Sequence, residues 1–149
     1  MSLVMDEAIQ IQRQAIVNEA LTWKKTPYHH EASVKGAGVD CAMFLVKVYG
    51  DLGFIPCFDP RPYSPQWHLQ HSEEIYLKFV EKYAQKVDKP LPGDVALYKF
   101  GRCISHGAIV IEWPAIIHVV AYIGCLLDDG TQGQLKGRLH GFYSLFKGV

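Results

Sequence analysis

The stretch DVALYKFGRCISHGAIVIEWPAIIHVVAY, residues 94–122, decides the fold. Its apolar residues are mostly β-branched or aromatic, and they stand in short runs interrupted at Gly101 and at Trp113-Pro114. Short runs of this composition with turn residues between them predict strands, and connections this short join antiparallel neighbours. With two runs that follow in the sequence, strands are predicted over 94–100, 104–112, 115–122, 125–127 and 139–146.

The residues before the last third of the chain favour helices. Helices are predicted over 6–24, from Cys41 to a C′ residue at Gly53, and over 72–84. Helices followed by consecutive strands are typical of an α+β fold with an antiparallel sheet. A chain of 149 residues normally forms one core, so residues 1–149 are predicted to be a single domain.

Composition excludes several classes of function. Basic and acidic residues number 15 each, so the formal net charge is +0 and nucleic acid is not an expected partner. The first residues lack the basic and apolar regions of a signal peptide, and no apolar run approaches the ~18 residues that span a membrane. Synthesis in the cytoplasm without a membrane span is therefore expected.

Metal and disulfide sites are not predicted. The four cysteines are Cys41, Cys57, Cys103 and Cys125. They contain no C-x-x-C pair, so neither a disulfide framework nor a zinc ribbon is expected. His68, His71 and Glu74 have the spacing of one helical face, but without an evident fourth ligand they are interpreted as surface residues. Asp128-Asp129-Gly130 is predicted to be a turn, and no cofactor is expected.

Cys41 is the candidate nucleophile. Asp40 is a favourable N-cap, which places Cys41 in the first helical position. There the unpaired N–H groups and the helix dipole favour a thiolate, and the same N–H groups suit a developing oxyanion. The alternative is a small buried hydrophobic residue, which most free cysteines are. The catalytic interpretation therefore requires a nearby base.

Two histidines are candidates for that base. His106 and His118 lie in consecutive predicted strands, each six residues from Glu112. If the hairpin folds about Glu112, the two imidazoles face each other on one side of the sheet. Such a pair suggests a base and the group that orients it. Each histidine taken alone is more simply a half-buried strand residue.

Four segments together resemble the NlpC-type cell-wall peptidases, a papain-like family of cysteine hydrolases. The segments are Thr26-Pro27-Tyr28 with the Gly-rich loop after it, Gly38-Val39-Asp40-Cys41 with Phe44, Pro92-Gly93-Asp94-Val95-Ala96-Leu97, and Ser105-His106-Gly107 with Ile117-His118. The resemblance spans most of the chain. It implies a papain-like fold in which the helices pack on the C-terminal antiparallel sheet.

The resemblance also implies an activity. It implies Cys41 as nucleophile, His106 as general base and His118 as the residue that orients the base. Tyr28 and Asp40 are expected on the oxyanion and substrate side, and the alternative for Tyr28 is packing against the first helix. The implied reaction is hydrolysis of peptidoglycan stem peptides between γ-D-glutamate and the diamino acid. An amidase, an acyltransferase or a silent tail module are the alternatives.

Finer detail resembles the phage-tail and prophage branch of this family. The segments concerned are residues 63–69, Tyr-Ser-Pro-Gln-Trp-His-Leu, and residues 97–101, Leu-Tyr-Lys-Phe-Gly. They imply phage tail proteins as partners and a place on the virion. Tyr63, Trp67 and His29 are expected to bind substrate, unless the aromatics pack on the core and His29 is solvated. Ala42-Met43 departs from the serine-glycine that commonly follows the nucleophile.

Overall fold

The structure, a computed structural model, describes residues 3–56 and 80–146. Its helical elements are α1 (Leu3–Leu21), α2 (Cys41–Asp51), a helical turn at 80–83 and the short 3-10 helix η2 (Gly133–Leu135). Its strands are β1 (Ser33–Val34), β2 (Gly38–Val39), β3 (Gln85–Val87), β4 (Val95–Phe100), β5 (Cys103–Glu112), β6 (Ala115–Val120), β7 (Gly124–Asp129) and β8 (Leu139–Ser144).

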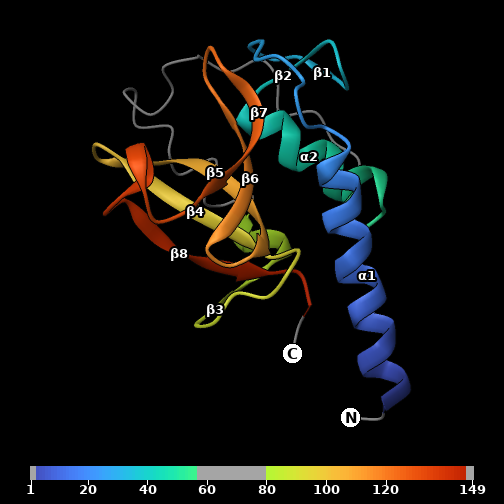
Figure 1. The fold of residues 1–149 in the computed structure, drawn as a ribbon. Helices are drawn as coiled ribbons and strands as arrows, with labels where there is room; N and C mark the ends of the chain where they lie inside the picture. The colour runs from blue at the N-terminus through green and yellow to red at the C-terminus, as the bar shows by residue number, and fades with distance from the viewer. Residues whose placement is uncertain (1–2, 57–79, 147–149) are drawn as a thin grey trace.

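The larger sheet has six antiparallel strands in the order β3-β8-β4-β5-β6-β7. The two helices α1 and α2 lie together beside this sheet, and α2 contacts β5 and β6 (Figure 1). The predicted α+β fold with an antiparallel sheet is therefore confirmed. No helix among the described residues is both long enough and apolar enough to cross a membrane.

Most element boundaries fall close to those expected from the sequence. The N-cap at Asp40 and the C′ residue Gly53, which has a φ of 81°, are both confirmed. The first helix ends at Leu21 rather than near residue 24. The strand after residue 115 ends at Val120 rather than 122. Of the helix predicted over 72–84, only its last residues lie within the described part of the chain, and 80–83 are helical.

Alternation along the strands divides the apolar residues between two clusters. In β5 and β6, Ile109 and Ile117 join the main core with α1 and α2, whereas Val110 and Ile116 join a smaller cluster. Successive strand side chains point to opposite faces, so the smaller cluster lies on the face away from the helices. Both faces of the central strands are thus buried, which fixes the register of the strands that carry the histidines.

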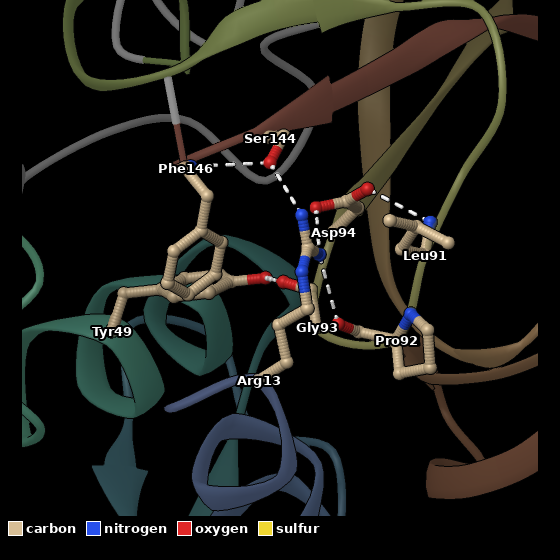
Figure 2. Close-up of polar contacts among 8 residues, drawn as sticks. All are labelled: Arg13, Tyr49, Leu91, Pro92, Gly93, Asp94, Ser144 and Phe146. Atoms are coloured by element: carbon tan, nitrogen blue, oxygen red, sulfur yellow. Dashed lines mark hydrogen bonds and ion pairs between the residues drawn. The ribbon is translucent and has the colours of Figure 1, made fainter. Parts of the chain in front are cut away.

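A buried polar group joins the first helix to the sheet (Figure 2). The guanidinium of Arg13 donates to the Asp94 carboxylate at 2.7 Å, to the Pro92 carbonyl at 3.0 Å and to the Ser144 hydroxyl at 3.2 Å. We refer to these four residues as the Arg13 cluster. The turn before β4 requires Gly93, because its φ is 90° and a Cβ there would lie 3.3 Å from the Arg13 carbonyl.

A second junction brings the segment before α2 against the edge strand β7. Lys25 N–H donates to the Cys125 carbonyl, and Cys125 N–H donates to the Thr26 carbonyl, each at 2.9 Å. The contact is close enough to require Gly124, since a Cβ there would lie 2.6 Å from the Thr26 oxygen. This junction holds Tyr28 and the start of α2 beside the strands that carry the candidate base.

Candidate active site

Cys41 occupies the first residue of α2, as the sequence predicts. Asp40 caps the helix, since its Oδ1 accepts from Met43 N–H at 2.9 Å. The expectation of a lowered thiol pKa is wrong. Burial and the negative charge of Asp40 raise the pKa of Cys41 to about 12, although the backbone N–H groups of Cys41 and Ala42 act in the opposite direction. The helix start is present, but burial has the larger effect.

The two histidines are hydrogen-bonded, although their register differs from the one expected. His106 Nε2 lies 2.8 Å from His118 Nδ1. Ile109 pairs with Ile117, so the β5–β6 hairpin is centred nearer Trp113 than Glu112. His106 and His118 are therefore diagonal neighbours on one face rather than direct partners, a spacing that long side chains can still bridge. The predicted pairing of two imidazoles holds, because a shift of two positions preserves the face.

Asp128 extends this pair, a role that was not predicted from the sequence. Its Oδ2 lies 3.0 Å from His118 Nε2. The expected turn at 128–130 begins later, because β7 continues to Asp129. His118 pairs with Leu126 across the β6–β7 ladder, so Asp128 is its diagonal neighbour. An acidic residue two positions beyond a strand partner was the available signal. We call His106, His118 and Asp128 the histidine relay.

Burial keeps both histidines of the relay neutral at ordinary pH. Burial, with a smaller contribution from His118, lowers the pKa of His106 to about 3. Burial also lowers the pKa of His118, while the hydrogen bond and charge of Asp128 oppose that change. In the free protein the thiol of Cys41 and the imidazole of His106 therefore face the cleft without net charge.

A cleft of about 610 Å³ brings the predicted site residues together. Its lining includes Tyr28, Asp40, Cys41, His106, His118 and Asp128. It does not include His29, which is exposed, whereas the neighbouring His30 does line the cleft. Tyr63 and Trp67 lie outside the described residues, so their substrate-binding role stays a prediction.

Tyr28 and Asp40 have different surroundings in this cleft. The Tyr28 ring lies 5.5 Å from the Tyr122 ring, and burial together with Asp40 and Cys41 raises the pKa of its hydroxyl. Asp40 is buried, and its Oδ2 accepts from Glu31 N–H at 2.7 Å. Asp40 therefore fixes both α2 and the loop before it, in addition to lining the cleft.

The remaining polar candidates give no second site in the described part of the chain. No group of three or more His, Cys, Asp or Glu side chains there could hold a metal ion. Cys103 and Cys125 are buried, and burial raises the pKa of Cys125 to about 12. Cys57 and the spaced pair His68 and His71 lie outside the described residues.

The described geometry brings three polar groups to one cleft. A thiol at the start of a buried helix shares a cleft with a histidine on an antiparallel sheet, and a further polar residue is hydrogen-bonded to that histidine. A thiol, a base and a group that orients the base are the components that nucleophilic catalysis by cysteine requires. The chain has the fold of NlpC/P60 proteins, as comparison with solved structures shows.

Three NlpC/P60 structures illustrate the likeness. A lipoprotein-like NLP/P60 protein of Staphylococcus aureus is 19% identical with a TM-score of 0.62, over 89% of this chain and 41% of that one. The NlpC/p60 domain of the peptidoglycan hydrolase SagA is 20% identical with a TM-score of 0.57, over 88% and 96%. RipD of Mycobacterium tuberculosis, a non-catalytic NlpC/p60 domain protein, is 12% identical with a TM-score of 0.55, over 88% and 94%.

These similarities show the fold. No family model and no curated protein matches the sequence. The chain spans less than half the length of the S. aureus protein.

Proposed function

We propose that this protein is a cysteine endopeptidase that hydrolyses amide bonds in peptidoglycan stem peptides. The observation that carries the proposal is the cleft that Cys41 shares with the hydrogen-bonded pair His106 and His118. Nucleophilic catalysis by a thiol needs a base and a group that orients the base, and this cleft contains all three. The NlpC/P60 fold, shared with a domain of the peptidoglycan hydrolase SagA, supports the choice of substrate.

The first half of the reaction forms an acyl-enzyme. Because the thiol and the imidazole start neutral, the proton of Cys41 passes to His106 as Sγ attacks the carbonyl carbon. The N–H groups of the first turn of α2 and the Tyr28 hydroxyl stabilise the oxyanion. His106 then gives its proton to the leaving amine, the C–N bond breaks, and a thioester remains on Cys41.

The second half releases the product. A water molecule attacks the thioester carbonyl while His106 accepts its proton. The C–S bond then breaks, the proton returns to the sulfur of Cys41, and the new carboxylic acid leaves. Burial favours the neutral form of His106 at the start of each half, so the imidazolium exists only while the substrate or acyl group occupies the cleft.

For the scissile bond we propose the link between γ-D-glutamate and the diamino acid, and for the setting a phage tail that degrades the wall locally. The resemblance of residues 63–69 and 97–101 to the phage-tail branch supports the second part, with tail proteins as partners and the virion as location. Digestion of purified peptidoglycans with different stem peptides, followed by mass spectrometry, tests both bond and class. Acyl-transfer products, or cleavage of the amide bond that links the stem peptide to the sugar, would contradict the endopeptidase assignment.

A second candidate is peptidoglycan binding without turnover. The raised pKa of Cys41 favours it, because the thiol is protonated in the free protein. RipD, which shares this fold, is described as a non-catalytic domain adapted to peptidoglycan binding. The two candidates differ in one measurement: an endopeptidase creates new amino groups in isolated peptidoglycan, and a binding module sediments with peptidoglycan without creating them.

A further inference from the structure

We infer that Asp128 is a positioning residue that fixes the tautomer of His106 through His118, so that Nδ1 of His106 is the atom that accepts the thiol proton. The inference rests on the proposed function for its catalytic meaning. It goes beyond a cysteine with two histidines, because it assigns a role to a third polar side chain on the opposite strand of the β6–β7 pair.

The position of the Asp128 carboxylate is set by two contacts. Its Oδ1 accepts from the Asp129 N–H at 2.8 Å, and its Oδ2 lies 3.0 Å from His118 Nε2. The His118 side chain is 3% exposed and the Asp128 side chain is 42% exposed. The relay therefore connects His106, through the buried imidazole of His118, to a carboxylate that water can reach.

The donors and acceptors that these groups possess determine which ring nitrogen of each histidine carries the proton. A carboxylate only accepts, so the proton between Asp128 and His118 resides on His118 Nε2. A neutral imidazole carries one proton, and burial keeps His118 neutral, so its Nδ1 is an acceptor. The 2.8 Å contact then requires His106 Nε2 to be the donor.

One consequence concerns the nitrogen of His106 that reacts. With its proton on Nε2, His106 keeps a free lone pair on Nδ1. The described residues give this nitrogen no hydrogen-bond partner, and the His106 side chain lines the same cleft as Cys41. Without Asp128, His118 Nε2 has no carboxylate to donate to, and a water molecule can either accept from it or donate to it. Both tautomers of His106 then become accessible, and one of them places a proton where the base must accept one.

The test is the tautomer of His106, read from the ¹⁵N signals of its two ring nitrogens in the full chain at neutral pH. The wild type should show the proton on Nε2. Asp128→Ala should show a mixture of both tautomers. Asp128→Asn should also give a mixture, because an amide can accept or donate. The control is Asp129→Ala, since Asp129 binds Thr131 and not His118, and it should keep the wild-type signals.

Hydrolysis gives the second readout. Asp128→Ala should lower kcat by about 10- to 100-fold, the loss that follows when a carboxylate orienting a histidine is removed from a metal site, with KM and melting temperature near wild type. An unchanged His106 tautomer in both Asp128 variants would overturn the inference. Because the spectra need no substrate, an Asp128-dependent tautomer in a protein that cleaves no peptidoglycan would overturn the proposed function and leave this inference standing.

Discussion

The Arg13 cluster and the histidine relay are both largely buried polar networks, but they differ in how far water reaches their side chains. In the Arg13 cluster the ion pair is closed on all sides, with Arg13 and Asp94 side chains 6% and 1% exposed (Figure 2). All three residues of the relay line the cleft, and Asp128 at one end of the relay is 42% exposed. A closed network holds one arrangement of protons and charges, whereas an open one can exchange a proton at either end.

Sequence position separates the networks in the same way. Arg13 reaches Asp94 across 81 positions and joins α1 to the sheet. The residues of the relay all lie on β5, β6 and β7, which are neighbouring strands of one sheet, so the relay does not connect the sheet to a helix. The first is therefore expected to govern stability, and the second to govern chemistry.

The largest expected effect is loss of hydrolysis when the reacting pair is cut. Cys41→Ala and His106→Ala should each lower kcat by roughly 10⁴- to 10⁶-fold, since catalytic groups of this kind act as a unit. Adding His118→Ala to His106→Ala should change little more. The control Cys125→Ala removes a buried thiol outside the cleft and should keep activity. Wild-type turnover in the Cys41 variant would remove the proposed mechanism.

The next effect is on stability and should leave the chemistry of the folded molecules intact. Arg13→Met or Asp94→Leu should each lower the free energy of unfolding by about 3–5 kcal/mol, because the partner is left as a buried unpaired charge. The double variant should recover much of this loss, the more so because Arg13 Nε has no partner within the described residues. Urea unfolding measures all three.

A surface ion pair provides the control for that series. Lys47 and Asp51 lie 3.1 Å apart on α2, with side chains 36% and 48% exposed. Asp51→Asn should change the free energy of unfolding by no more than about 0.5 kcal/mol. Equal losses in the Asp51 and Asp94 variants would show that burial does not set the contribution of the Arg13 cluster.

The third prediction concerns stability and pH. The unfolded His106 binds a proton as pH falls below its ordinary pKa of 6.5, whereas the folded one resists until about pH 3. The contribution of His106 to the free energy of unfolding is therefore fully present above pH 6.5, and it is lost as the pH falls toward 3. His106→Gln should flatten this decrease, measured as melting temperature between pH 7 and pH 4. The exposed His29 serves as control, and an equal flattening in His29→Gln would refute the assignment to burial.

Local chemistry explains what the sequence predicted. The β-branched runs correctly predicted the central strands β4, β5 and β6, and Asp40 correctly predicted the start of α2. The His106–His118 contact survived an error of two positions in register, because side chains repeat every second residue. These features depend on neighbours in the chain, so one sequence contains enough information to place them.

Tertiary packing explains what the sequence did not predict. The strand β3, Gln85–Val87, has only three residues and forms because β8 lies beside it. Asp128 gains its role only from the register of β6 against β7. The pKa of Cys41 is raised because the helix start is buried beside Asp40, and burial depends on the whole fold. Each of these depends on segments brought together from different parts of the chain.

The smallest effects are expected at the turn after β6, where the rim of the cleft carries a conformational cost. Tyr122 is 93% exposed with a φ of 68°, a region that L-residues other than Asn and Asp rarely adopt. Its ring contacts Tyr28 at the cleft, with 5.5 Å between ring centroids. Strain at an exposed functional rim is tolerated when the side chain makes a useful contact.

Variants of Tyr122 should separate the effect of its backbone strain on stability from the effect of its ring on substrate binding. Tyr122→Asn tolerates the positive φ but lacks the ring, so the free energy of unfolding should stay within about 1 kcal/mol of wild type. KM should rise by about 2- to 10-fold, which corresponds to an aromatic contact of about 0.5–1.5 kcal/mol. Tyr122→Phe keeps the ring and should keep KM. If Tyr122→Asn leaves KM unchanged, the Tyr122 ring does not contact substrate. The substrate-binding region then includes the histidine relay and Tyr28 but not Tyr122.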